Sequence, residues 1–220
     1  MKWNVKLTVV ATFVLGASSA LADKLSDFKE AVGKEGCESI VYSDLKSNCS
    51  SEQGNVHDYC DGPRGPVGCG SESITRQLKG NIDKEKKNIE ELKDRKSKLE
   101  TDRNRATDDN EKNRLSKEIE QVEKDIYEAG KRLDQAVNDL DTRRKLVDDS
   151  IYNIGKCLDY RRSVMNVFAY AQDKVRGETD PDIVPLARQL RDKWEESKRG
   201  HGIAITDKEN ALKICKDSRP

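Results

Sequence analysis

Residues 115–140 read LSKEIEQVEKDIYEAGKRLDQAVNDL, and this stretch decides the fold. Its apolar residues recur at alternating spacings of four and three, namely Leu115, Ile119, Val122, Ile126, Ala129, Leu133, Ala136 and Leu140. Such spacing places one narrow apolar seam along a helix, which a partner helix covers by packing knobs into holes. The pattern predicts a coiled-coil helix in an all-α protein.

The chain before this stretch, from Ser73 onward, carries a weaker form of the same seam. Its apolar members are Leu78, Ile82, Ile89, Leu92, Leu99 and Ala106, and its polar members are Glu85, Lys96 and Arg103. The seam slips out of phase between 106 and 115, where residues 107–110 are cap and turn formers. We therefore expect an antiparallel hairpin arm of about 50 Å with its tip near 107–111 and residues 72–106 against 112–146. One continuous helix that needs partner chains is the alternative.

The first 22 residues have the pattern of a secretory signal peptide. Lys2 and Lys6 precede an apolar run over 7–16, and residues 20–22 form a small-x-small cleavage site. The run is shorter than the roughly 20 residues of a membrane-spanning helix, which argues against a membrane anchor. We expect an exported protein that begins at Asp23, lies in the periplasm or outside the cell, and has no integral membrane segment after cleavage.

Composition limits both the core and the partners. Charged residues make up 37% of the chain and hydrophobic residues 34%, so a large globular core is not expected. Removing residues 1–22 leaves 39 basic against 41 acidic residues, a net charge of about −2, with the signs interleaved. This balance argues against nucleic acid and anionic lipid as partners. Disorder is the competing interpretation, and the regular seam and the cysteines oppose it.

Six cysteines in an exported chain predict three disulfides, formed by Cys37, Cys49, Cys60, Cys69, Cys157 and Cys215. Ser43 is the expected N-cap of a helix over 44–60, which would place Cys49 and Cys60 about 16 Å apart, too far to pair. Cys60 and Cys69 flank a turn-rich loop that could close on itself, and Cys157–Cys215 is the other candidate pair, tying the long helix to the C-terminal helix. The remaining pair would be Cys37–Cys49. The spacings are too wide for a zinc site, so no metal is expected.

These features predict three parts after the signal peptide. Residues 23–70 form a cysteine-rich helical module, 71–176 form the arm, and 177–220 form two helices packed on the module. The first of those two helices carries Ile183, Ala187, Leu190 and Trp194. A loop is expected at 199–202, and a capping box at 206–209 opens the last helix.

No catalytic or cofactor-binding residue is expected, because neither His57 nor His201 has a recognisable catalytic partner. We expect a non-enzymatic structural or interaction protein of a periplasmic or cell-surface assembly, which binds protein partners or self-associates through its coiled coil. Tyr59, Arg64 and Val67, in and beside a turn-rich loop, are the candidate contacts.

Two alternatives remain from the sequence. A signal peptide followed by a helical hairpin on a head is similar in outline to tentacle-type outer-membrane-protein chaperones. That resemblance implies a periplasmic chaperone that holds clients between helical arms. The chain differs from this outline in its six cysteines and in lacking a positively charged arm and an evident strand-forming body. A secreted adhesin or effector is the other alternative.

Overall fold

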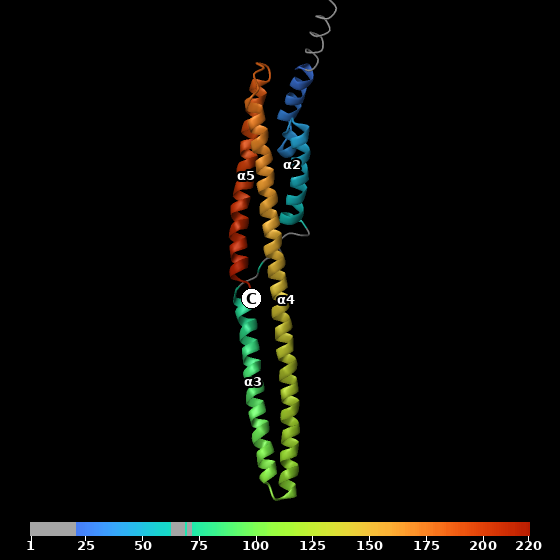
Figure 1. Cartoon of the computed structure of the whole chain (residues 1–220), viewed down its shortest axis with the longest axis vertical. Coiled ribbons are helices and arrows are strands. Elements are labelled where there is room, and N and C mark those ends of the chain that lie inside the picture. The colour runs from blue at the N-terminus through green and yellow to red at the C-terminus, as the bar shows by residue number, and fades with distance from the viewer. Residues whose placement is uncertain (1–20, 63–68, 70–71) are drawn as a thin grey trace, which may run out of the picture. The chain divides into compact units, whose positions relative to one another are not determined.

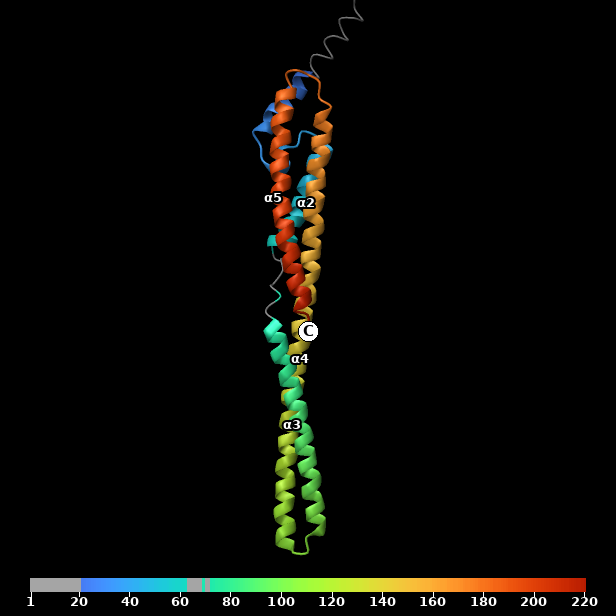
Figure 2. The same ribbon diagram turned by 90° about the vertical axis from the view of Figure 1, so that its left-hand side faces the viewer.

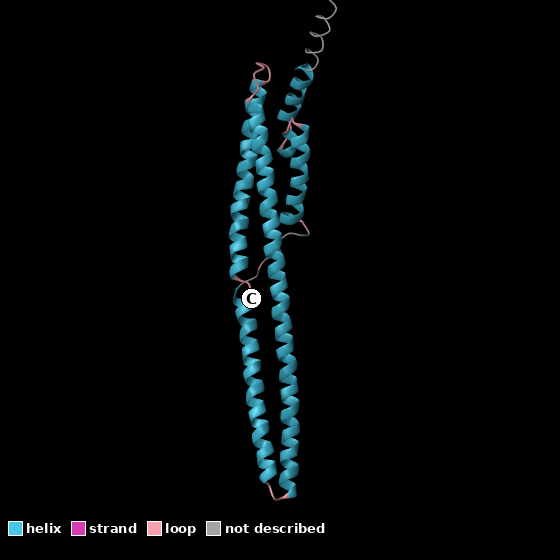
Figure 3. Ribbon diagram, viewed as in Figure 1, coloured by secondary structure: helices cyan, strands magenta, loops and turns pink. Residues whose placement is uncertain are grey.

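The computed structural model describes residues 21–62, 69 and 72–220, which form helices and connecting loops with no strand (Figure 3). A helix over residues 21–32 is followed by the 3-10 turn η1 (Gly36–Ser39), α2 (Ser43–Val56) and the π-helical turn η2 (His57–Asp61). Three long helices come next: α3 (Glu72–Arg105), α4 (Asp109–Arg176) and α5 (Val184–Asp217). The all-α prediction is confirmed, whereas most of the predicted signal peptide lies outside the described residues.

The described chain divides into two compact units. Unit 1 contains residues 21–62 and 152–212, and unit 2 contains residues 69, 72–151 and 213–220. Residues 152–176 of α4 lie in unit 1 with the N-terminal module and most of α5.

Unit 2 is built on the predicted hairpin, in which α3 and the first part of α4 run antiparallel side by side (Figures 1 and 2). The chain turns at residues 106–108. Asp108 begins α4: its Oδ2 accepts a hydrogen bond from the Glu111 amide at 3.2 Å, and its carbonyl accepts one from the Lys112 amide at 3.0 Å. A side-chain acceptor there satisfies an amide that the first helical turn leaves unpaired. The predicted tip is confirmed, and the continuous helix is excluded.

The seam lies between the two helices of the arm. On α4, five of the eight predicted seam residues are buried (Leu115, Ile119, Val122, Ala129 and Ala136), and the other three are half-buried. On α3, Ile82 is buried and the remaining seam residues are half-buried. In a two-helix arm each helix covers the seam of the other from one side only, so the seam side chains of α3 remain partly exposed.

The polar seam residues of α3 form ion pairs with α4. Glu85 Oε1 lies 3.2 Å from Arg132 Nε, and Lys96 Nζ lies 2.6 Å from Glu123 Oε1. The hydrogen bond from Arg132 lowers the pKa of Glu85, and the one to Glu123 raises the pKa of Lys96. Two such pairs fix an antiparallel register, because a shift by one helical turn would break both.

Reversing the charge of one partner tests this register. We expect Lys96→Glu to lower the free energy of unfolding, and the Lys96→Glu/Glu123→Lys double variant to recover part of that loss. Urea denaturation of the four proteins of the double-mutant cycle measures the coupling. Lys87→Glu is the matched control, since Lys87 is exposed and pairs with Glu91 on its own helix. A coupling of zero between positions 96 and 123 would contradict the register.

The base of the arm is held by the last residues of the chain. The Cys69–Cys215 disulfide links the segment before α3 to the end of α5, with a Cα–Cα distance of 4.9 Å. Thr75 Oγ1 donates to the Ser218 carbonyl at 3.1 Å, and Ser218 Oγ donates to the Cys215 carbonyl at 3.1 Å. All four side chains are buried, so this cluster anchors the first turn of α3.

Unit 1 is organised around the second part of α4, where the seam continues in phase. Its positions are occupied by Ile154, Cys157, Arg161, Val164, Phe168, Ala171 and Val175, and all except Arg161 are buried. Helix α5 runs antiparallel to this segment (Figures 1 and 2). Ile183, directly before α5, and Ala187, Leu190 and Trp194 within it are buried, as their spacing predicts.

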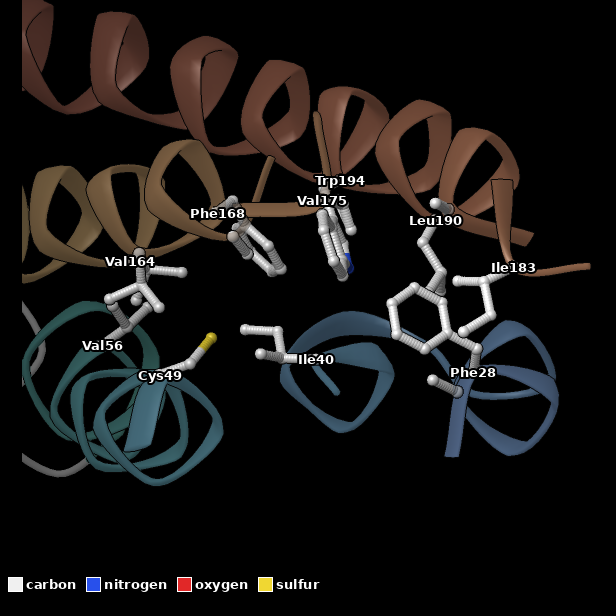
Figure 4. Close-up of a cluster of buried hydrophobic side chains, with 14 of the residues drawn as sticks. Phe28, Ile40, Cys49, Val56, Val164, Phe168, Val175, Ile183, Leu190 and Trp194 are labelled. Atoms are coloured by element: carbon white, nitrogen blue, oxygen red, sulfur yellow. The ribbon is translucent and has the colours of Figure 1, made fainter. Parts of the chain in front are cut away.

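The N-terminal module completes this core by packing against α4 and α5. Phe28, Ile40, Cys49 and Val56 come from the helix of residues 21–32, the segment after η1, and α2, and all four are buried in the shared cluster (Figure 4). Ser43 is the first residue of α2 and not its N-cap, which is Tyr42. The predicted start of this helix is therefore displaced by one residue.

The disulfides differ from the predicted pairing in two of three cases. Cys37–Cys49 is confirmed, but Cys60 pairs with Cys157 and Cys69 pairs with Cys215. The prediction paired cysteines that are near in sequence or lie in successive helices. In the structure, η2 brings Cys60 to α4, where Cys157 occupies a seam position, and Cys69 lies in the other unit. Cys49 and Cys60 do not pair, as expected.

Helix α5 is continuous, so the predicted loop at 199–202 and the helix start at 206–209 are wrong. Thr206 Oγ1 donates to the Gly202 carbonyl at 3.2 Å, a bond within the helix and not an N-cap. Each glycine costs a helix interior about 1 kcal/mol relative to alanine. Packing of α5 on both sides of these residues outweighs that local cost.

Candidate functional site

A cavity of about 580 Å³ that is open to solvent lies in unit 1 and is the candidate site. Four elements line it: the segment around η1, α2, α4 and α5. Its wall includes the cysteine Cys37, the hydroxyls of Ser50 and Ser197, and the side chains of Arg161 and His201. Ligand sites of small molecules usually occupy about 300–1,000 Å³, so the cavity is large enough for one.

Arg161 enters the cavity wall from a seam position of α4. Its side chain is 14% exposed, and its ion contact is with Asp61, whose Oδ2 lies 3.7 Å from the guanidinium. Arg161 Nε is buried and has no hydrogen-bond partner. A buried donor without a partner costs about 1–3 kcal/mol.

His201 reaches the same cavity from α5. Its ring lies 6.4 Å from the ring of Phe168, which also lines the cavity, and its Nδ1 is buried without a hydrogen-bond partner. Burial, together with the positive charge of Arg161, lowers the pKa of His201 below its usual value. The imidazole is therefore neutral at pH 7, and no carboxylate on Nδ1 orients it as a general base.

The carboxylates at the rim are already neutralised. Glu38 Oε2 lies 2.7 Å from Lys46 Nζ, and Glu35 Oε1 lies 3.0 Å from Lys193 Nζ. The hydrogen bond from Lys46 lowers the pKa of Glu38. Because these two acids are paired, the positive charge of Arg161 favours a ligand with an acceptor or an anionic group.

The residues singled out from the sequence lie mostly elsewhere. Tyr59 is half-buried with its ring 5.5 Å from that of Tyr160, while Arg64 and Val67 lie outside the described residues. His57 is exposed at the start of η2. Of the predicted disulfide residues, Cys37 lines the cavity. The seam residues 115–140 belong to the other unit.

Sequence reasoning missed Arg161 and set His201 aside as a loop residue. A signal for Arg161 was present: Val147, Ile154, Phe168 and Val175 follow a strict seven-residue spacing, and Arg161 interrupts it. No comparable signal existed for His201, because its place depends on α5 continuing through Gly200 and Gly202.

Two further findings concern the described residues. Among them, no group of three His, Cys, Asp or Glu side chains is placed to bind a metal ion. None of the helices within 21–62 and 72–220 combines the length and the apolarity needed to cross a membrane.

The chain matches no protein-family model, and no curated protein or solved structure is detectably similar to it.

Proposed function

We propose that the protein is an exported, non-enzymatic interaction protein whose α3/α4 arm contacts a protein partner. One observation carries the proposal: the arm closes its own seam within one chain. Helices α3 and α4 cover the seam between them, and two ion pairs set the register of the two helices. A disulfide holds the base of the arm. The arm is thus a preformed surface, and a preformed surface loses little conformational entropy on binding.

Export is supported by the disulfides and by the pattern of the first 22 residues. Three disulfides are typical of an oxidising compartment, since reducing compartments keep cysteines as thiols. The periplasm and the cell exterior both meet this condition.

The outer faces of the arm carry large apolar side chains that the seam does not use. Tyr127 is 63% exposed, Leu146 is 46% exposed and Val137 is 40% exposed, and all three lie on α4 within unit 2. Aromatic and aliphatic anchors set among charges are a common composition of protein-binding surfaces. Self-association would have to use these faces, because the seam residues already face their partner helix.

The chaperone alternative receives less support. Holding a client between arms requires helices that stand apart and expose apolar surface to each other. Here α3 and α4 pack directly together along the seam, and Glu85 and Lys96 close it with ion pairs.

Site-specific photo-crosslinking in the native host tests the proposed function. A photoreactive phenylalanine analogue replaces Tyr127 in the arm or, as the matched control, Tyr170 in unit 1. Both are exposed tyrosines on α4, with 63% and 65% of their surface accessible. We expect discrete protein adducts of the exported chain from position 127 and few from position 170.

The positions at which adducts form distinguish the arm from unit 1 as the binding surface. Adducts confined to position 170 would place the interface on unit 1 and overturn the role of the arm. Absence of adducts from both positions, with normal amounts of exported chain, would contradict a function in protein binding.

A further inference from the structure

The Cys37–Cys49 disulfide differs from the other two bridges in its access to solvent. Both members of the Cys60–Cys157 pair and both members of the Cys69–Cys215 pair are between 0% and 6% exposed. In the third pair Cys49 is fully buried, but Cys37 is half-buried and lines the cavity. Thiol–disulfide exchange requires a thiolate to reach a sulfur, and exposed disulfides are the labile ones.

The Cys37–Cys49 bridge also closes the shortest loop. Its cysteines are 12 residues apart, whereas the separations are 97 for Cys60–Cys157 and 146 for Cys69–Cys215. A disulfide that closes a short loop restricts the unfolded chain least, so reducing that disulfide lowers the free energy of unfolding least. Cys60–Cys157 would still tie η2 to α4. Unit 1 can therefore lose the first bridge and remain folded.

The cavity beside Cys37 suits the remainder of a small thiol. Arg161 lines the cavity and brings the positive charge of its guanidinium, which lies 3.7 Å from Asp61 Oδ2. Ser50 and Gln53 offer polar groups from α2, and no neighbour lies within 4 Å of where a Cβ would stand at Gly36 or Gly200. A guanidinium fork matches the two oxygens of a carboxylate. The pairing of Glu35 and Glu38 with lysines reduces their repulsion of such an anion.

We propose that Cys37–Cys49 is a thiol-exchange site for low-molecular-weight thiols that carry a carboxylate, which Arg161 binds. The thiolate attacks Cys37 Sγ, the Cys37–Cys49 bond breaks, and Cys49 leaves as a thiolate that takes up the proton lost by the incoming thiol. The product is a mixed disulfide on Cys37. A second thiol attacks it and releases a low-molecular-weight disulfide, so two thiols are oxidised and one protein disulfide is reduced.

The burial of Cys49 fixes which sulfur is attacked. Cys49 is 0% exposed, whereas Cys37 is half-buried and lines the cavity, so an incoming thiolate reaches Cys37 Sγ and the mixed disulfide forms on Cys37. This site is independent of the partner proposed for the arm, because every residue it uses lies in unit 1.

Timed reduction of the oxidised chain by glutathione, with alkylation and peptide mapping, tests the site. We expect glutathione on Cys37 and free thiol on Cys49 before any thiol appears at the other four cysteines. In Arg161→Gln we expect the rate with glutathione to fall by about fivefold relative to the rate with mercaptoethanol, which lacks a carboxylate. The mercaptoethanol rate in the same variant corrects for any change in folding.

Arg162→Gln is the matched control, because Arg162 neighbours Arg161 but pairs with Glu209 at 2.6 Å and does not line the cavity. Its ratio of the two rates should equal that of the unmodified chain. Reduction of another bridge first, or glutathione on Cys49, would overturn the exchange site. Equal ratios in Arg161→Gln and Arg162→Gln would overturn the role of Arg161 and with it the preference for a carboxylate.

Discussion

Replacing Cys60 and Cys157 together by alanine is expected to lower the free energy of unfolding by about 4–5 kcal/mol. The bridge closes 97 residues, and the loss of chain entropy that a crosslink imposes on the unfolded state grows with the logarithm of that number. Both cysteines are buried in unit 1, so alanine also leaves unfilled volume behind. Urea denaturation followed by helical circular dichroism measures the change.

The Cys37→Ala/Cys49→Ala variant is the control for this prediction. Its bridge closes 12 residues, for which the same entropy relation gives about 3 kcal/mol. We expect the Cys60/Cys157 variant to be the less stable of the two. Equal stabilities would contradict the argument from loop length, and peptide mapping that found Cys60 joined to Cys69 would contradict the connectivity itself.

The same bridges show where sequence reasoning reaches its limit. The hairpin could be predicted because a seam is local information: the positions of Leu115, Ile119 and Val122 identify the buried face of α4 without reference to any other segment. The phase slip between 106 and 115 located the tip in the same way. Disulfide pairing depends on which segments meet in space, and six cysteines allow 15 pairings that no local pattern distinguishes.

The candidate site was harder to predict than the fold for a related reason. Its cavity is formed by four segments that are far apart in sequence, and each contributes residues that look ordinary alone. The local conformational preference of Gly200 and Gly202 predicts a loop, yet tertiary packing keeps α5 helical through them. Once α5 is continuous, His201 faces Phe168 and the cavity exists. Tertiary packing therefore outweighs local helix propensity in the part of α5 that lines the cavity.

Trp194→Ala is expected to cost about 3–5 kcal/mol of stability, as for other large aromatic side chains removed from a core. Trp194 is 0% exposed and belongs to the cluster that joins α5, α4 and the N-terminal module (Figure 4). Thermal and urea unfolding of the variant measure the loss. The matched control is Tyr170→Ala, which removes an exposed aromatic side chain. We expect it to change the free energy of unfolding by less than about 0.5 kcal/mol.

The indole of Trp194 also makes a buried hydrogen bond, which a second pair of variants isolates. Trp194 Nε1 donates to Ser39 Oγ at 2.9 Å, and Ser39 Oγ donates to the Gly36 carbonyl at 2.6 Å. Gly36 has a φ of 53°, a left-handed conformation that glycine adopts readily, so these bonds hold a turn that the glycine allows. In the double-mutant cycle of Trp194→Phe and Ser39→Ala, we expect a coupling energy of about 1 kcal/mol.

That coupling decides how the N-terminal module is held in unit 1. Trp194 lies on α5 and Ser39 in η1, so their bond joins segments 155 residues apart in the chain. If the two substitutions are additive, this hydrogen bond does not help to hold the module, which then depends on its apolar packing, its disulfides and ion pairs such as that of Lys193 with Glu35. A measured coupling would mean that the hydrogen bond also fixes η1, and with it the position of Cys37 beside the cavity.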